Sequence, residues 1–232
     1  MENIIDLTQY ETKAAYKNPT VQDFCSKDKN RNNMNAVYCK QGFQIATDGR
    51  MLIMVQEEYP TEYERALVSV GKARNKKIFG IDSEVHIDTK TDFVPFEKVI
   101  PNTENYTDCL VQWNVCCNTF YHNANTAYYL IKKIQGRHEF PCKILLKEKF
   151  YSVEHIALAS AYMKKYGQAE HVYMHDNPTE YKDDVLVFEN ERYKIIIKPC
   201  NEPKPYEMRI LGNKFYTYCA KEKIAKYLTR IE

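Results

Sequence analysis

Residues 42–55 read GFQIATDGRMLIMV, and this stretch predicts two β-strands joined by a tight turn. The pair Asp48-Gly49 is a strong hairpin signal, because a primed turn needs residues that tolerate positive φ. The segment from Met51 to Val55 is apolar throughout, which is typical of a buried strand. The chain is therefore expected to build part of its core from antiparallel strands.

The composition is that of a soluble protein with a substantial core. The chain has 232 residues, of which 44% are hydrophobic and 28% charged, so it can form one large domain or two small ones. No apolar run approaches the roughly 18 residues of a membrane span, and the N-terminus lacks the features of a secretory signal. Eight cysteines without an export signal are expected to be reduced thiols, which favours a cytoplasmic protein with no membrane partner.

The formal net charge of +2 excludes little, but the charges are unevenly distributed. Between residues 126 and 165 the acidic residues are few, whereas basic residues are frequent. This excess could form a surface that faces a polyanion, or it could be an ordinary solvated face. Tyr128 and Tyr129 lie near two of these lysines and could stack nucleobases or form the edge of the core. The basic residues are Lys132, Lys133, Arg137, Lys143, Lys147, Lys149, Lys164 and Lys165.

Start and stop signals predict four helices. They are expected to begin at Thr20, at Thr61, near Asn123 or Asn125, and at Ser152. Strands are expected in most of the segments between them, including residues 77–82, 84–89, 98–100 and 110–116. The result is an α+β pattern with more strand than helix.

The order of these elements indicates a coarse internal repeat. Each half has two helices separated by strands and ends in a strand that stops at a proline, first at Pro101 and then at Pro199. Proline ends a strand ladder because it removes a hydrogen-bond donor. The two halves share little sequence, so the repeat rests on the order of elements alone.

Three segments resemble, in the same order, the bacterial sliding-clamp family, the beta subunit of DNA polymerase III. They are Thr47-Asp48-Gly49 with the following Arg50 and Leu52, FVPFEKVIP at residues 93–101, and YKIIIKPC at residues 193–200. The resemblance implies an α+β, DNA-clamp-like fold of two repeated domains, with curved antiparallel sheets that carry helices on their concave side. It also implies a non-enzymatic processivity factor, without cofactor or metal, that forms a homo-oligomeric ring around double-stranded DNA.

The same resemblance divides the chain into three parts. Residues 1–105 resemble the family's middle domain, residues 106–200 resemble its last domain, and residues 201–232 form a C-terminal extension of strand plus helix. The family's first domain has no counterpart, and the length matches two-domain clamps that assemble as trimers. In the extension, an apolar helical stripe is expected to pack as core or to lie over the partner site. The stripe comprises Ile224, Tyr227, Leu228 and Ile231.

The resemblance also implies two sites. Because helices line the hole of the family's rings, the DNA-binding candidates are the basic ends of the third and fourth helices: Lys132, Lys133, Arg137, Lys164 and Lys165. Peptides of a DNA polymerase and of a clamp loader would dock in an apolar groove formed by Thr47, Gly49, Arg50, Leu52, Pro101, Lys198, Pro199 and Cys200. Arg50 and Lys198 make this groove more basic than the family pattern, which favours peptides with an acidic residue.

Two other functions remain open. Asp82, Glu84, His86 and Asp88 alternate with other residues, so they lie on one face of a predicted strand. This acidic face could hold Mg²⁺ or Mn²⁺ in a nucleic-acid enzyme, or it could be the solvated side of a half-buried strand. An interaction module that keeps the clamp fold without closing a ring is the third possibility. The cysteine and histidine spacing matches no compact zinc site.

Overall fold

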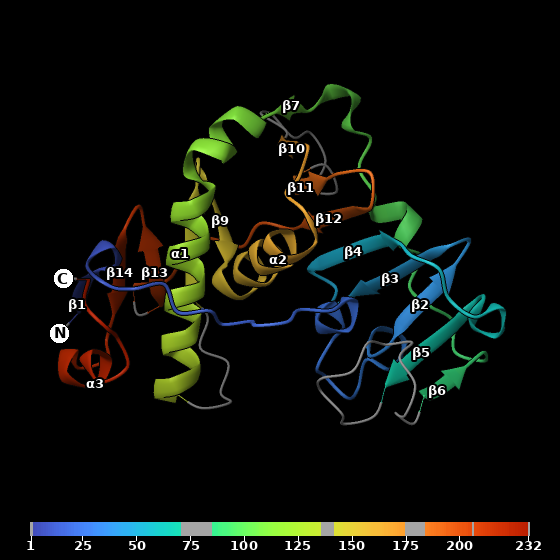
Figure 1. The fold of residues 1–232 in the computed structure, drawn as a ribbon, viewed down its shortest axis with the longest axis horizontal. Helices are drawn as coiled ribbons and strands as arrows, with labels where there is room; N and C mark the ends of the chain where they lie inside the picture. Colours follow the sequence, from blue (N-terminus) through green and yellow to red (C-terminus); the bar gives the residue numbers. More distant parts are fainter. Residues whose placement is uncertain (1, 71–84, 136–141, 175–183, 206, 232) are drawn as a thin grey trace. The chain divides into compact units, whose positions relative to one another are not determined.

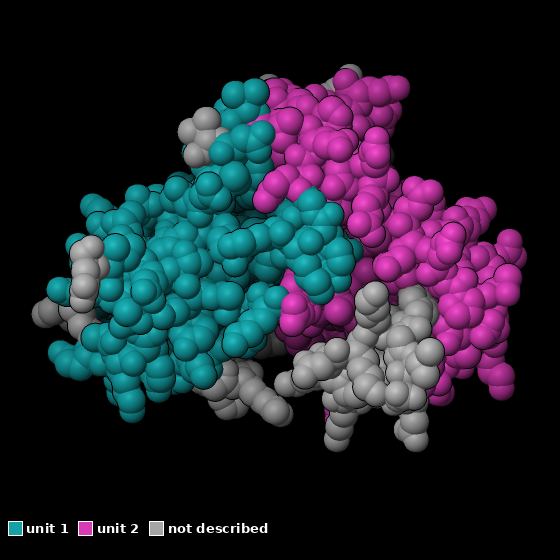
Figure 2. Space-filling model, viewed as in Figure 1, with its two compact units in different colours: residues 1–17, 111–167, 199–232 teal, residues 18–110, 168–198 magenta. Residues whose placement is uncertain are grey.

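The computed structural model describes residues 2–70, 85–135, 142–174, 184–205 and 207–231. The α+β class is confirmed, because the chain forms two large, mainly antiparallel sheets and few α-helices (Figure 1). It divides into two compact units, each assembled from separate stretches of sequence. Figure 2 colours unit 1 (residues 1–17, 111–167 and 199–232) teal and unit 2 (residues 18–110 and 168–198) magenta. These boundaries differ from the contiguous segments 1–105, 106–200 and 201–232 expected from the resemblance.

Unit 2 is built on a sheet of nine strands in the order β6-β5-β2-β3-β4-β12-β11-β10-β7. Every neighbouring pair in it is antiparallel. The pairing of β4 with β12 joins strands that lie more than a hundred residues apart in the sequence. The strands are β2 (Val37–Lys40), β3 (Phe43–Thr47), β4 (Met51–Gln56), β5 (Ala66–Val70), β6 (Val85–Asp88), β7 (Thr107–Asp108), β10 (His171–Met174), β11 (Leu186–Glu189) and β12 (Tyr193–Ile197).

Both faces of the central strands in unit 2 are covered. On one face, Leu52 of β4 and Ile196 of β12 belong to a buried cluster that also contains Phe96. Phe96 lies in a 3₁₀ turn (Phe96–Val99), and Val99 and Ile100 pack against the same cluster. A second 3₁₀ turn (Val21–Phe24) packs against strands β3 and β4. Burial on both sides explains why β4 is apolar throughout, as a fully buried strand requires.

Unit 1 combines a five-stranded sheet with α-helices. The strand order is β1-β14-β13-β8-β9, and only the pairing of β13 with β8 is parallel among these neighbours. None of the described helices is both long and apolar enough to cross a membrane. The elements are β1 (Asn3–Asp6), a 3₁₀ turn (Leu7–Gln9), α1 (Leu110–Gln135), β8 (Cys142–Leu146), β9 (Lys149–Ser152), α2 (Val153–Tyr166), β13 (Met208–Leu211), β14 (Lys214–Thr217) and α3 (Lys221–Ala225).

Helix α2 has the ends that the sequence predicts. It begins after Ser152 and ends at Gly167, whose φ of 114° lies outside the range of most residues and whose amide donates to Met163 O over 3.0 Å. The helix packs against β8 and β9, and most of its residues are buried. Asn125 of α1 donates to Ser160 of α2 over 3.2 Å, which fixes the two helices side by side.

The C-terminal extension is an integral part of the unit 1 sheet. Strands β13 and β14 lie between β1 and β8, and Ile210 and Phe215 are 0% and 1% exposed. Within the apolar stripe, Ile224 is buried whereas Ile231 is 60% exposed, so only part of the stripe packs as core.

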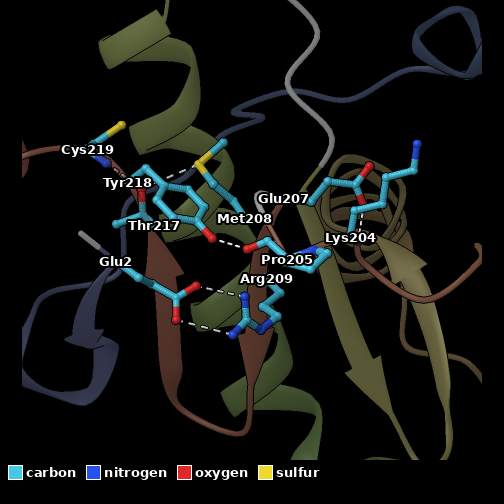
Figure 3. Close-up of polar contacts among 9 residues, drawn as sticks. All are labelled: Glu2, Lys204, Pro205, Glu207, Met208, Arg209, Thr217, Tyr218 and Cys219. Carbon is cyan, nitrogen blue, oxygen red and sulfur yellow. Dashed lines mark hydrogen bonds and ion pairs between the residues drawn. The ribbon is translucent and has the colours of Figure 1, made fainter.

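Polar contacts reinforce this attachment (Figure 3). Arg209 donates to both carboxylate oxygens of Glu2, at 2.8 and 3.3 Å, which joins the two ends of the chain. Glu207 accepts from the Lys204 amide and from the Lys143 ammonium, each at 2.8 Å. The Lys143 hydrogen bond holds the pKa of the Glu207 carboxyl below its usual value. Besides the contacts of Arg209 with Glu2 and of Lys204 with Glu207, Figure 3 draws Tyr218 Oη to Pro205 O, Thr217 Oγ1 to Met208 Sδ, and Cys219 N to Thr217 Oγ1.

Several predicted elements differ from those observed. The helix expected at Thr20 is the single 3₁₀ turn Val21–Phe24, although the capping box of Thr20 and Asp23 is present. The helix expected at Thr61 is the 3₁₀ turn Thr61–Tyr63, followed directly by strand β5. The expectation of two helices in each half is therefore wrong for the described residues.

The third predicted helix begins much earlier than expected. Residues 110–116, predicted as a strand, form the first two turns of α1, where Asp108 Oδ1 accepts from Leu110 N over 2.9 Å. Residues 98–100 end a 3₁₀ turn and are not a strand. The predicted strand 77–82 lies outside the described residues.

We expect the extension to contribute to stability as ordinary core. The substitution Ile210→Ala should lower the free energy of unfolding by about 2–5 kcal/mol, because it leaves a cavity at a fully buried position. Val111→Ala, in which a 74% exposed side chain is shortened, should cost about 1 kcal/mol or less. Urea denaturation of both variants measures the difference. Equal losses for the two would contradict the assignment of β13 to the core.

Candidate functional site

The Thr47–Arg50 turn is held by its own side chains. Thr47 Oγ1 donates to Met51 O over 2.7 Å and accepts from Gly49 N over 3.0 Å. Asp48 Oδ1 accepts from the amides of Arg50 and Met51, each at 2.8 Å. Short polar side chains of this kind bond to backbone two or three residues on, and they define the turn locally.

The central residues of the turn are Gly49 and Arg50, one position later than the sequence suggests. Asp48 N donates to Met51 O over 3.3 Å, and Thr47 pairs with Leu52. Gly49 has φ 90° whereas Arg50 does not have positive φ, a pattern that fits a type II′ hairpin with glycine first. The guanidinium of Arg31 donates to Asp48 O over 2.9 Å and lies where a Cβ on residue 49 would point.

The structure brings several predicted groove residues together in unit 2. Lys198 N donates to Arg50 O over 2.9 Å, so the end of β12 lies beside the hairpin turn. Leu52 pairs with Ile196, and Ile100, the neighbour of Pro101, packs against the cluster that contains both. Segments near residues 50, 100 and 197 therefore converge on one side of the nine-stranded sheet.

The apolar part of this site is already covered. Thr47 and Leu52 are 5% and 4% exposed, and Pro101 is also buried. Leu52 packs in one cluster with Phe96, so the chain's own residues 93–106 occupy the position where a peptide would contact it. Gly49 and Arg50 are exposed and Lys198 is half-buried.

The other two predicted groove residues belong to unit 1. Pro199 and Cys200 are half-buried, and Cys200 N donates to Phe150 O of strand β9 over 2.7 Å.

The candidate DNA-binding lysines lie on the two long helices of unit 1. Lys132 and Lys133 are in the last turn of α1, and Lys164 and Lys165 are in the last turn of α2. All four are exposed, and Arg137 lies outside the described residues. Cations in a last turn also stabilise the negative end of the helix dipole, so the placement has a structural reason as well.

Each of these lysines packs over a tyrosine ring. The ammonium-to-centroid distances are 5.3 Å for Lys132 over Tyr128, 5.6 Å for Lys133 over Tyr129, 4.3 Å for Lys164 over Tyr121, and 4.7 Å for Lys165 over Tyr166. Cation–π contacts at exposed sites are worth about 0.5–1 kcal/mol, so they orient the lysines without neutralising them. The sequence pointed to Tyr128 and Tyr129, whereas Tyr121 was missed because its lysine lies on the other helix.

The four lysines form two separate positive regions. The contact of Lys164 with Tyr121 and that of Asn125 with Ser160 show that α2 runs antiparallel to α1. Lys164 therefore lies beside the middle of α1, about 16 Å along the helix axis from Lys132 at 1.5 Å per residue. DNA carries one negative charge per roughly 1.7 Å, so a spread of this length faces several phosphates rather than one.

The acidic face predicted for a metal-dependent enzyme is described only in part. Asp82 and Glu84 lie outside the described residues, whereas His86 and Asp88 lie on β6. Asp88 Oδ1 accepts from the amides of Lys90 and Thr91, at 2.8 and 3.1 Å. Hydrogen bonds from the Thr91 side chain and from these amides lower the pKa of Asp88. The carboxylate therefore stabilises the turn that follows β6. No group of three potential metal ligands occurs among the described residues.

Comparisons with known proteins give weak structural similarities only. No family model and no curated protein matches the chain. The structure of DNA polymerase III subunit beta from Borrelia burgdorferi, in complex with a natural product, has 10% identity and a TM-score of 0.41, covering 88% of this chain and 65% of that one. The DNA polymerase sliding clamp from Caulobacter crescentus has 13% identity and a TM-score of 0.34, covering 88% and 67%. The chain thus spans about two thirds of the length of these proteins.

We expect the Asp48 carboxylate to be required for the turn that positions Arg50. Asp48→Ala removes the acceptor of two backbone amides and should lower the free energy of unfolding by about 1–2 kcal/mol. Asp48→Asn keeps a side-chain oxygen in the same place and should cost about 0.5 kcal/mol or less. Urea denaturation compares the two variants, and similar losses would mean that the hydrogen bonds do not hold the turn.

Proposed function

We propose that this protein is a sliding-clamp-like processivity factor. It encircles duplex DNA as a homo-oligomeric ring, and it tethers a DNA polymerase through short peptides that dock near the hairpin turn. It performs no chemistry itself. Closure of the ring, rather than contacts to bases, keeps such a protein on DNA, so its inner surface needs only weak attraction to phosphates.

The observation that carries the proposal is the convergence in unit 2. The three segments that resemble the sliding-clamp family are far apart in the sequence, and the backbone bond from Lys198 to Arg50 and the packing of Ile100 bring them together. A resemblance due to chance would not predict that these three segments share one site. The two charges at this site, the exposed Arg50 and the half-buried Lys198, support a preference for peptides that carry an acidic residue.

The lysines of α1 and α2 support the DNA-binding part of the proposal. They are exposed and spread along the helix pair, as a sequence-independent phosphate contact requires. The tyrosine rings beneath them hold their ammonium groups near the helix surface, which shortens their reach and favours diffuse attraction over tight binding.

Ring closure would use the edge strands of the two sheets. Among the strands that the structure describes, β1 is an edge of the five-stranded sheet and β6 is an edge of the nine-stranded sheet, and each exposes an isoleucine. Ile4 is 49% exposed and Ile87 is 38% exposed. Pairing of an edge in unit 1 with an edge in unit 2 of the next copy is a head-to-tail contact, which closes into a ring when its rotation permits.

The DNA-binding proposal is tested by charge reversal on the helices. Lys133→Glu combined with Lys164→Glu should weaken binding to duplex DNA and reduce the slope of log K against log salt concentration by about one per lost contact. The control is Lys214→Glu with Lys223→Glu, which changes the net charge equally at exposed positions outside α1 and α2. Equal weakening by both pairs would show that only net charge matters.

The ring is tested by the oligomeric state in solution. Sedimentation of the full chain should show a closed oligomer, and Ile4→Lys or Ile87→Lys should raise its dissociation constant at least about tenfold, since each places a charge in an apolar contact. Val111→Lys, at a 74% exposed position on α1, should have little effect. A strictly monomeric protein at all concentrations would favour the interaction module without ring closure.

The peptide site is tested with the full chain, because β13 and β14 belong to the core and cannot be removed. A hydrophobic clamp-type peptide with an acidic residue should bind, and Arg50→Ala should weaken its binding about two- to fivefold, as expected for an exposed charge pair. The control peptide carries an amide in place of the acid and should be insensitive to Arg50→Ala. Fluorescence anisotropy measures both, and absence of any binding would refute this site.

A further inference from the structure

An extended N-terminal segment crosses helix α1 in unit 1. We call residues 11–17 the strap; in Figure 1 it is part of the blue segment that follows β1 and passes across α1. Three successive hydrogen bonds tie the strap to the helix. They are Thr12 Oγ1 with His122 Nδ1 at 2.8 Å, Lys13 N to Thr126 Oγ1 at 3.2 Å, and Ala15 N to Asn125 Oδ1 at 3.3 Å.

The strap lies on a different side of α1 from the sheet. Asn123 donates to Gly212 O, in the turn between β13 and β14, over 3.0 Å. At 100° per residue, the three helix positions that bond the strap, His122, Asn125 and Thr126, lie within roughly 100° of one another, and their mean direction is roughly 105° from that of Asn123. The helix therefore contacts the β13–β14 turn through one side, and the strap covers another.

The helix is built to hold this strap. Asn125 and Thr126 are both 0% exposed, although polar side chains are rarely buried in mid-helix. Buried polar groups need hydrogen-bond partners, and the strap amides of Ala15 and Lys13 donate to the buried oxygens of Asn125 and Thr126. His122 Nε2 must donate to Leu7 O, over 2.7 Å, since a carbonyl only accepts, which leaves Nδ1 to accept from the Thr12 hydroxyl when the ring is neutral.

Tyr16, near the end of the strap, contacts one of the candidate DNA-binding lysines. The Tyr16 ring stacks on Tyr128 with centroids 5.7 Å apart, and its hydroxyl donates to Glu154 of α2 over 3.3 Å. The Lys132 ammonium lies 5.1 Å from the Tyr16 centroid and 5.3 Å from that of Tyr128. Lys132 is thereby held by the strap, whereas Lys133 packs on Tyr129 of its own helix.

We propose that the strap is a displaceable cover of the helix surface, and that DNA phosphates compete with it for Lys132 and for the adjoining face of α1. This inference rests on the proposed DNA binding and adds its regulation. The strap is suited to local release from α1, because it contacts this helix through hydrogen bonds and the Tyr16 ring, while Glu11 and Lys13 at its start bond Thr229 and β1 before it stays paired with β14 along four residues. The apparent affinity for DNA then falls in proportion to the fraction of molecules in which the strap is released, so a strap that is docked most of the time weakens DNA binding.

The first experiment weakens the strap without touching a lysine. Tyr16→Ala removes the stacked ring, the hydroxyl bond to Glu154 and the cation–π contact. The variant should bind duplex DNA about two- to fivefold more tightly than the natural chain at fixed salt, the factor expected from releasing one exposed cation–π contact. Tyr129→Ala, which frees Lys133 in the same way on the helix itself, shows how much of any gain comes from freeing a lysine alone.

The second experiment tests the lysine that the strap holds. Lys132→Ala should weaken DNA binding more in the Tyr16→Ala background than in the natural chain, because only there is Lys132 fully available. Lys133→Ala should weaken binding by the same factor in both backgrounds. A Lys132 effect that is independent of Tyr16 would overturn the competition.

Hydrogen exchange reports on the strap directly. The amides of Lys13 and Ala15, which donate to Thr126 and Asn125, should exchange faster when duplex DNA is added to the natural chain, and faster still in Tyr16→Ala. If DNA binds but leaves this exchange unchanged or slower, or if Tyr16→Ala binds no tighter, the strap is not a cover and DNA binding still stands. If neither chain binds DNA, the proposed function fails and the cover fails with it.

Discussion

The pairing of β4 with β12 is the contact on which unit 2 depends. It joins a meander of strands from the first hundred residues to strands that lie after residue 170, and it places Leu52 opposite Ile196 and Ile53 opposite Ile195. These side chains are 0–4% exposed, so the junction is buried on both faces of the sheet. Because a one-residue slip would turn every side chain to the wrong face, the register of this pair is strongly specified. That register also sets Lys198 beside Arg50.

Local signals explain what the sequence predicts correctly. Strands β3 and β4 have the expected bounds because glycine and aspartate fix the turn and the apolar run after it indicates a buried strand. Helix α2 has the expected ends: Ser152 precedes its first residue without a side-chain capping hydrogen bond, and Gly167, with positive φ, ends it within one turn. The grouping of the hairpin with Ile100 and the end of β12 was expected from the resemblance alone, since nothing in the local sequence indicates which distant strands pair.

Tertiary contacts explain what the sequence does not predict. Asn123 and Asn125 look like helix caps, yet they lie inside α1, where one holds the β13–β14 turn and the other holds α2 and the strap. The residues after Thr61 follow helical spacing and carry a capping signal, yet pairing of β5 with β2 and β6 draws them into a strand. In both places the long-range partner outweighs a preference of a few tenths to one kcal/mol per residue.

The same reasoning bears on the two candidate sites, because in each a surface that a partner would need is covered by the chain itself. Residues 93–106 cover Leu52 in unit 2, and the strap covers part of α1 in unit 1. The two covers differ in chemistry. Phe96 is anchored in an apolar cluster, which makes its release costly, whereas the contacts of the strap with α1 are polar bonds and one half-buried ring. Water can replace polar bonds at little net cost but cannot replace apolar burial. Of the two proposed sites, the helix surface is therefore the one that a competing ligand would open more readily, while a peptide bound as proposed at the hairpin would first contact the exposed Gly49 and Arg50 and the half-buried Lys198.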